Sequence, residues 1–170
     1  MDLKALVRSI PDFPKEGILF RDITPLIADP EGFRELIDRM AEILKEKKVD
    51  VVVGPEARGF IFSAALARAL NVGLVLARKP GKLPYQTISH EYALEYGTDE
   101  LQIHVDSIKP GQRVAVVDDL LATGGTALAC AKLCEKAGGT VVDCCFVIEL
   151  CDLPGRETLK DYAVDTILKY

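Results

Sequence analysis

The sequence from Val114 to Ala127 reads VAVVDDLLATGGTA, and this stretch decides the fold. Its apolar start predicts a buried strand, which ends in two adjacent acids, Asp118 and Asp119. A short apolar step follows, and two glycines then stand between two threonines over residues 123–126. A helix is predicted over residues 127–137, because two glycines follow and end its pattern. The stretch therefore predicts a strand, a tight polar turn and a helix.

The rest of the chain repeats this alternation. Apolar runs predict strands at residues 49–54, 72–78, 113–119 and 140–150. Helices are predicted at residues 1–10, 30–47 and 60–70, the second starting at the cap Asp29-Pro30-Glu31. Residues 11–29 are expected to be mostly loop with a short strand at 18–20, and residues 90–97 and 100–105 to form a half-exposed hairpin. Strands separated by helices imply an α/β fold, a parallel sheet with helices on both faces, in a single domain over residues 1–170.

Composition and charge exclude some classes of function. The 170 residues carry a formal net charge of −5, and general nucleic-acid binding requires a basic face. No run approaches the roughly 20 apolar residues of a membrane span, and residues 1–10 lack the apolar core of a signal peptide. We therefore expect a cytoplasmic protein that binds neither nucleic acid nor membrane, while a local cluster of cations can still hold a small anion.

The cysteines point to packing and not to a disulfide framework. There are five, an odd number, and no pair has the CxxC spacing of a redox motif. Cys130 and Cys134 share a helix face and could bind a metal, but without a neighbouring His or Cys they are better interpreted as core residues. Cys144 and Cys145 are adjacent on a predicted strand, so their side chains should point to opposite faces of the sheet.

The glycines of the central stretch suit a phosphate. Gly124 and Gly125 lack a Cβ, which lets the backbone turn tightly and approach a ligand. The helix that follows offers free N–H groups and the positive end of its dipole, to which the hydroxyls of Thr123 and Thr126 can add hydrogen bonds. No GK[ST] follows, so this is not the ATP-binding P-loop.

The two acids suit a different part of the same ligand. Carboxylates beside a phosphate would repel it, so Asp118 and Asp119 are expected to face sugar hydroxyls, or a Mg²⁺ ion at one remove. A phosphate cup next to two acids describes a site for a sugar phosphate. The alternative is an ordinary strand-to-helix turn with solvated acids, which the full order of residues makes less favourable.

This stretch resembles the 5-phosphoribosyl-1-pyrophosphate (PRPP) motif of the type I phosphoribosyltransferases. Further motifs appear in order, IPDFPKEGILFRDITPL at 10–26, EARGFIF at 56–62, RKPGKLP at 78–84, LEYG at 94–97, and VIEL and GRE at 147–150 and 155–157. Together they resemble the adenine phosphoribosyltransferases over almost the whole chain. One departure is Ser63, where the pattern leads us to expect glycine.

The resemblance implies a fold and a reaction. The fold is the type I phosphoribosyltransferase fold, a central, mostly parallel sheet flanked by helices, with a small N-terminal hood region and a flexible lid loop. The reaction transfers the phosphoribosyl group of PRPP to N9 of adenine, giving AMP and pyrophosphate, with Mg²⁺ as cofactor. Members of the family are homodimers, and a cation of the lid loop is expected to reach the partner's site.

The resemblance also assigns the phosphate-binding residues. It implies that the 5-phosphate is bound by Ala122, Thr123, Gly124, Gly125 and Thr126, and that the ribose hydroxyls are bound by Asp118 and Asp119. Pyrophosphate falls to Glu56, Ala57, Arg58, Arg78, Lys79 and Lys82. The family often has a cis non-proline peptide that would fall at Glu56-Ala57. The last three cations stand in a long polar loop, which could simply be solvated. With two prolines and a glycine among them, a mobile lid over a polyanion is the preferred interpretation.

The base and the catalytic acid come from other motifs. The resemblance places adenine against Leu19, Phe20, Arg21 and Leu150. Phe20 would stack on the base, although it could equally be a core aromatic. No metal ligand is assigned directly, because Mg²⁺ is carried by PRPP or pyrophosphate. Ala122 cannot transfer a proton, so the catalytic role falls to Glu95, which the family places at the base; most glutamates are simply exposed.

Two other functions stay open. A phosphoribosyltransferase for hypoxanthine, guanine or xanthine would generally carry an aspartate at the position of Ala122. A regulator that binds PRPP without catalysis would commonly carry an added nucleic-acid-binding segment, whereas here the motifs fill the chain. Turnover with PRPP and a panel of bases distinguishes all three.

Overall fold

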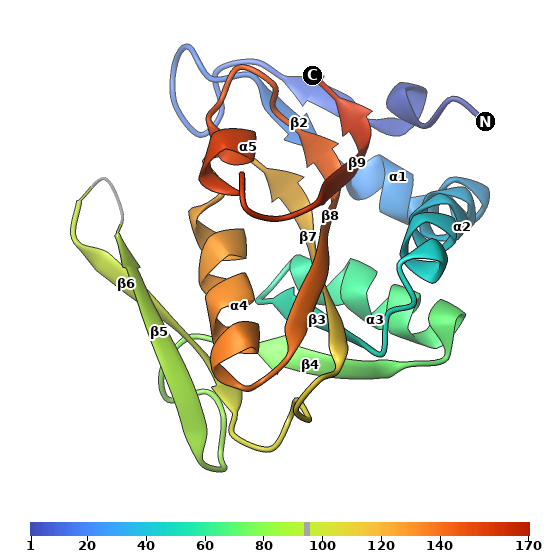
Figure 1. Ribbon diagram of the computed structural model, residues 1–170. Coiled ribbons are helices and arrows are strands. Elements are labelled where there is room, and N and C mark those ends of the chain that lie inside the picture. The colour runs from blue at the N-terminus through green and yellow to red at the C-terminus, as the bar shows by residue number, and fades with distance from the viewer. Residues whose placement is uncertain (94–95) are drawn as a thin grey trace.

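A five-stranded parallel sheet lies at the centre of the computed structural model, which describes residues 1–93 and 96–170 (Figure 1). The strand order is β4-β3-β7-β8-β9, and every neighbouring pair is parallel. The strands are β3 (Val51–Pro55), β4 (Gly73–Ala77), β7 (Arg113–Leu121), β8 (Thr140–Glu149) and β9 (Val164–Lys169). The α/β class and the parallel sheet predicted from the sequence are confirmed.

Helices cover both faces of this sheet. In Figure 1, α2 (Pro30–Glu46) and α3 (Gly59–Leu70) lie on one side and α4 (Gly125–Lys136) on the other. Alternate residues of β7 supply the two cores, Val114 and Val116 to the α4 side, and Ala115 and Val117 to the side of α2 and α3. This period of two is the pattern of a strand buried on both faces.

The predicted helices end close to where the sequence places them. α2 begins after Asp29, whose side chain accepts a hydrogen bond from Gly32 N, and it ends one residue before Lys47. α3 ends at Asn71, which adopts the left-handed conformation that closes a helix. None of the helices in the described ranges is both long and apolar enough to cross a membrane.

Two small antiparallel sheets flank the central one. β5 (Thr87–Ala93) pairs with β6 (Thr98–His104), and this predicted hairpin stands beside α4 and projects from the body of the molecule (Figure 1). β1 (Arg8–Ile10) pairs with β2 (Phe20–Asp22) near the N-terminus. Because β5 begins at Thr87, the polar loop is shorter than the sequence indicated.

Several sequence predictions are wrong in detail. Residues 1–10 do not form one helix, because only Leu3–Leu6 make a 3₁₀ turn (η1) before β1 begins. Residues 11–29 contain α1 (Thr24–Ala28), and their strand starts two residues later than expected. Neither α5 (Gly155–Thr158) nor β9 was predicted. These elements are short, and their partners in space, not their own periodicity, hold them.

The cysteine interpretation is confirmed. Cys130, Cys134 and Cys144 are fully buried in the core on the α4 side, and Cys145 is fully buried in the other core. Burial raises the pKa of the Cys134 thiol to about 12, so it stays protonated at neutral pH. These four residues therefore pack as small apolar side chains, while Cys151 is exposed.

A buried acid lies on β8. Both carboxyl oxygens of Asp143 are buried without a hydrogen-bond partner among the described residues. Burial, and after it the charge of the neighbouring Asp165, raise the pKa of Asp143 to about 7, while Lys47 acts in the opposite direction. Lys47 Nζ itself lies 3.2 Å from Asp165 Oδ2. The folded protein therefore binds a proton at Asp143 more tightly than the unfolded chain does.

This acid makes stability depend on pH. Because the folded-state pKa is raised, the free energy of unfolding should decrease as pH rises from about 4 to about 7. An Asp143→Asn variant should not show this loss and should be more stable than wild type at pH 8, by up to about 4 kcal/mol. Urea unfolding at pH 5 and pH 8 measures both values, with Asp161→Asn, a substitution of an exposed acid, as the control variant. An Asp143→Asn protein less stable at pH 8 would contradict the assignment.

Candidate functional site

Three adjoining cavities open at the carboxyl ends of the central strands. Their volumes are about 170, 160 and 210 Å³, and Arg58 and Asp119 line all three. This is the edge of a parallel sheet at which ligands usually bind. A larger groove of about 460 Å³ lies elsewhere, between α2 and the end of α3, and charged side chains of α2 form much of its wall. The three cavities form the candidate site.

The glycine-rich turn lines the second of these cavities. All five residues from Ala122 to Thr126 contribute to its wall, together with Asp118 and Asp119. Gly124 has a φ of +86°, a left-handed conformation that glycine adopts without strain, and it caps α4. The first N–H groups of α4 have no acceptor within the helix and are therefore available to an anion.

The two adjacent acids differ in their surroundings. Asp118 Oδ1 accepts a hydrogen bond of 2.8 Å from Asp119 N, and burial together with the Asp119 charge raises the pKa of Asp118. Asp119 Oδ2 accepts a hydrogen bond of 2.5 Å from Arg58 Nε. That contact raises the pKa of the Arg58 guanidinium. In the free protein Asp118 therefore holds its proton readily, while Asp119 is paired with a cation.

The third cavity is formed by the loop after β3. Glu56, Ala57 and Arg58 line it, opposite the acids and Thr126. The Glu56-Ala57 peptide is cis, at the position that the family resemblance implied. Glu56 N donates to Ala77 O over 2.9 Å, which ties the loop to the end of β4. The loop thus brings Glu56, Ala57 and Arg58 to one cavity.

The cations of the polar loop take three different positions. Arg78 Nε lies 3.2 Å from Glu56 Oε1, and Lys79 N donates to the same oxygen over 2.7 Å. The Lys79 ammonium group turns to the hairpin, where it pairs with Asp99. Lys82 is exposed. Within the described residues, none of these three side chains lines the three cavities. The structure therefore brings Arg58 to the site and leaves the three loop cations outside these cavities.

The first cavity is apolar and contains all four residues predicted for the base. Leu19, Phe20, Arg21 and Leu150 line it. The Phe20 ring also meets Phe13 edge-to-face, with centroids 5.1 Å apart. The sequence reasoning missed four more lining residues, Ile18, Ile23, Leu120 and Ile148. The alternation of Ile148 with Leu150 at the end of β8 was the available signal for the last of them.

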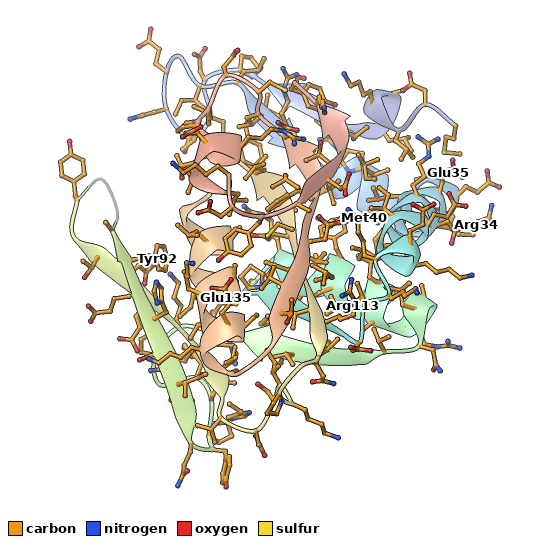
Figure 2. The ribbon with its side chains drawn as sticks, viewed as in Figure 1. Arg34, Glu35, Met40, Tyr92, Arg113 and Glu135 are labelled. Carbon is orange, nitrogen blue, oxygen red and sulfur yellow. The ribbon has the colours of Figure 1, made fainter. Side chains whose placement is uncertain are left out.

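The predicted catalytic residue, Glu95, lies outside the described residues. The strand before it passes the glycine-rich turn, since a Cβ added at Gly125 would lie 3.7 Å from the Tyr92 ring. Figure 2 shows Tyr92 on β5 beside α4. The Tyr92 hydroxyl lies 3.3 Å from both Lys79 Nζ and Asp99 Oδ2. The hairpin is thus connected both to the polar loop and to the turn.

The departure at Ser63 is accommodated locally. Its side chain is fully buried, and its hydroxyl donates to Gly59 O over 2.7 Å. Gly54 faces it, and a Cβ at that position would collide with the Ser63 side chain. A serine on α3 therefore fits because the facing strand residue is a glycine, and Ser63 has no contact with the cavities.

Comparisons with known proteins give consistent results. The family model described as Phosphoribosyl transferase domain matches residues 26–169. An adenine phosphoribosyltransferase of Clostridium perfringens is 61% identical over 100% of this chain and 99% of its own length.

Solved structures agree with this result. The crystal structure of an adenine phosphoribosyltransferase from Thermoanaerobacter pseudethanolicus has a TM-score of 0.95 and 52% identity, and the match covers 99% of this chain and 98% of that one. The Saccharomyces cerevisiae enzyme, crystallised with adenine and an imino-altritol bisphosphate, has a TM-score of 0.90 and 42% identity. That match covers 96% of this chain and 94% of the yeast one.

Proposed function

Since the chain belongs to the phosphoribosyl transferase family and to its adenine phosphoribosyltransferases, we propose that its three cavities hold the three parts of this reaction. Adenine occupies the apolar cavity, the 5-phosphate the glycine-rich one, and pyrophosphate the one beside Arg58. The observation that carries the proposal is their junction, because Arg58 and Asp119 line all three. Ribose C1, which exchanges pyrophosphate for adenine, belongs at that junction.

The reaction requires adenine N9, ribose C1 and the leaving oxygen of pyrophosphate to be held in line. The C1–O bond breaks, and its electron pair leaves with pyrophosphate. N9 of adenine forms the new bond to C1, and the purine loses one proton. Holding both partners converts this encounter into a step within one complex. Phe20 and Leu150 orient the base, while the N–H groups at the start of α4 and the hydroxyls of Thr123 and Thr126 hold the phosphate.

The acids and Arg58 handle the ribose and the leaving group. Asp118 and Asp119 are proposed to bind the ribose 2- and 3-hydroxyls, with which carboxylates form strong hydrogen bonds. Arg58 uses one of its five N–H donors on Asp119 and keeps others for a pyrophosphate oxygen. Glu56 and Ala57 line the same cavity, where their backbone can add further donors. Charge that develops on pyrophosphate is thereby met by fixed donors.

We propose that Mg²⁺ enters with PRPP. Asp118 and Asp119 line the second and third cavities, and Mg²⁺ prefers oxygen ligands such as their carboxylates. The raised pKa of Asp118 fits a group whose ionised form awaits a cation or hydroxyl donors. These two residues would hold the ion at one remove, through the sugar and water. When bound, the ion would neutralise part of the pyrophosphate charge.

The polar loop is proposed to close over the leaving group. Arg78 and the Lys79 backbone share the carboxylate of Glu56, so the loop is attached to the pyrophosphate cavity at one end. Lys82 is exposed, and Gly81, with a φ of +79°, lies next to it. Closure would bring cations to pyrophosphate and exclude water from the reacting carbon. Glu95 is proposed to handle the purine proton, because Ala122 cannot.

The protein is proposed to act as a homodimer. The edge strand β4 exposes Leu74 and Leu76 at 39% and 38%, and Ile61 on α3 is exposed at 40%. Apolar side chains at an unpaired sheet edge favour contact with a second copy. The cations of the polar loop follow β4 directly. A lid cation can therefore serve the partner's site.

Hybrid dimers test the sharing of the lid. A Lys82→Ala protein and an Asp119→Asn protein should each be slow, for different reasons. If Lys82 acts across the interface, mixed dimers carry one site with both native groups, and subunit exchange should restore up to about a quarter of wild-type activity per mixture. Activity that stays at the sum of the two variants would show that the loop serves its own subunit.

The same proposal covers organisation and location. One domain over residues 1–170 is proposed, because one sheet runs from β3 to β9 and both cores pack on it. The five free cysteines suit the reducing conditions of the cytoplasm, where we place the protein. With a net charge of −5, its partners are proposed to be small molecules and not nucleic acid or membrane.

Turnover with a panel of bases tests the function. With PRPP and Mg²⁺, adenine should release pyrophosphate and give AMP, while hypoxanthine, guanine and xanthine should be used far less. Omission of Mg²⁺ and addition of a chelator test the cofactor in the same assay. Equal use of a 6-oxopurine would contradict the base assignment. Binding of PRPP without turnover of any base would favour the regulator.

A further inference from the structure

The α5 turn packs directly behind the glycine-rich turn, on the side away from the cavity. Figure 1 shows α5 next to the N-terminal end of α4 and to the ends of β7 and β8. A Cβ added at Gly155 would lie 2.6 Å from Ala122 O, and one added at Gly124 would lie 3.0 Å from Gly155 O. The two turns therefore meet backbone to backbone, and two glycines make this approach sterically possible.

One side-chain hydrogen bond joins these turns. Thr158 Oγ1 donates to Thr123 O over 2.7 Å, and Pro154 O lies 3.1 Å from the same hydroxyl. The Ala122 and Thr123 carbonyl groups thus both face α5. In a trans peptide the N–H of the next residue points the opposite way from the carbonyl group. The N–H groups of Thr123 and Gly124 are therefore directed away from α5, to the side of the cavity that both residues line.

The α5 turn is itself held from two sides. Arg156 Nε and Nη2 bind both carboxyl oxygens of Glu149, over 2.6 and 2.8 Å, and Thr166 donates to the same carboxylate over 2.8 Å. Glu149 is buried at the end of β8, and Leu159, directly after α5, is fully buried in the core. The segment that carries Thr158 is therefore anchored by the Arg156–Glu149 pair and by Leu159, so the Thr158 hydroxyl can fix the peptide that it contacts.

We propose that Thr158 is a positioning residue for the 5-phosphate. Its hydroxyl holds the Thr123–Gly124 peptide with its carbonyl outward, which keeps the N–H groups of the turn directed into the cavity. Thr158 lines none of the three cavities, so it acts through the turn and not on the ligand. The Arg156–Glu149 pair fixes the base from which it acts. This inference rests on the proposed function, because it assumes that the glycine-rich cavity holds a phosphate.

The test compares two substitutions of one residue. Thr158→Val keeps the shape and removes the hydroxyl, whereas Thr158→Ser keeps the hydroxyl and removes a methyl group. A single neutral hydrogen bond corresponds to roughly a two- to tenfold change in affinity. We expect Thr158→Val to raise the KM for PRPP by about three- to tenfold, with kcat and the KM for adenine within about twofold of wild type. Thr158→Ser should restore the wild-type KM.

Calorimetric titration separates positioning from a general structural role. Thr158→Val should bind ribose 5-phosphate about three- to tenfold more weakly, while its affinities for adenine and pyrophosphate stay unchanged. Ser107→Ala is the matched control, since the Ser107 hydroxyl also donates to a backbone carbonyl over 2.7 Å, at a turn outside the three cavities. That variant should bind all three ligands like wild type.

Three results would overturn the inference, and a fourth would refute the proposed function of the cavity. Equal ribose 5-phosphate affinity in wild type and Thr158→Val, or a parallel loss of adenine affinity, would overturn the inference. So would a Thr158→Ser protein as impaired as Thr158→Val. Should Thr158→Val not fold, Thr158→Ala removes the same hydroxyl without the same bulk and answers the question. A wild-type protein that binds adenine but not ribose 5-phosphate would instead refute the proposed function of the cavity.

Discussion

A Glu95→Gln variant is expected to turn over adenine about 10²–10⁴-fold more slowly than wild type, which is the usual contribution of general acid–base catalysis. The reason is that the glycine-rich turn has no proton-accepting side chain at position 122. Ala122, which lines the glycine-rich cavity, has only a methyl side chain, so this position cannot take the proton that the purine loses. The family resemblance assigns that role to Glu95, which follows β5, the strand whose Tyr92 packs near Gly125.

The measurement must distinguish catalysis from binding. The Kd for PRPP should stay close to the wild-type value, because Glu95 is assigned to the base and not to the phosphates. The pH–rate profile should lose one limb, since the titrating group is gone. Glu91→Gln is a matched control, because Glu91 is an exposed glutamate of β5 with no assigned role. Wild-type kcat with an unaltered profile in Glu95→Gln would leave the purine proton to solvent.

An Asp119→Asn variant is expected to lose about 10- to 100-fold in kcat/KM for PRPP. Hydrogen bonds to a charged group are worth roughly 1.5–3 kcal/mol, and the substitution removes that charge. It also removes the negative charge that faces Arg58 across a contact of 2.5 Å, and both residues line all three cavities. Steady-state kinetics with PRPP varied measures the effect, and Asp106→Asn, an exposed turn residue, is the control. Wild-type kinetics would remove Asp119 from the ribose site.

Asp118→Asn should behave differently, with an effect that depends on pH. Burial and the Asp119 charge raise the pKa of Asp118, so at low pH the wild-type side chain is a neutral acid, similar to asparagine. As pH rises, more of the wild-type protein carries the carboxylate, which is the stronger acceptor for a hydroxyl. The ratio of wild-type to Asp118→Asn kcat/KM for PRPP should therefore increase with pH. A ratio independent of pH would contradict this assignment.

Local patterns in the chain were sufficient for the central units of the fold. The stretch from Val114 to Ala127 predicts its strand, turn and helix because apolar alternation, an acid pair and two glycines act over only a few residues. The same holds for α2, with its cap at Asp29, and for α3, which ends at Asn71. The opposite faces of Cys144 and Cys145 follow from the period of a strand.

Shorter elements lacked such a signal. α5 has only four residues, which is too short to display a helical period, and the sequence of β9, VDTILK, has neither an apolar run nor a strict alternation. β9 exists because β8 offers it an unpaired edge, with Cys144 aligned to Val164. The same reason explains the strand β1, which the sequence favoured as a helix. Its three residues pair with β2, and that pairing decided against the helical pattern.

The sequence by itself determined the kinds of residue at the site, whereas the tertiary structure alone decided their partners. The glycine-rich turn and the acid pair could be proposed as parts of the site because residue type and local order carry that chemistry, whereas the proposal for Phe20 came from the family resemblance. That Arg58 pairs with Asp119 and that Thr158 holds Thr123 could not be predicted. These pairs lie far apart in the chain, and no local pattern encodes a contact that arises only when the strands align and bring their ends to one edge.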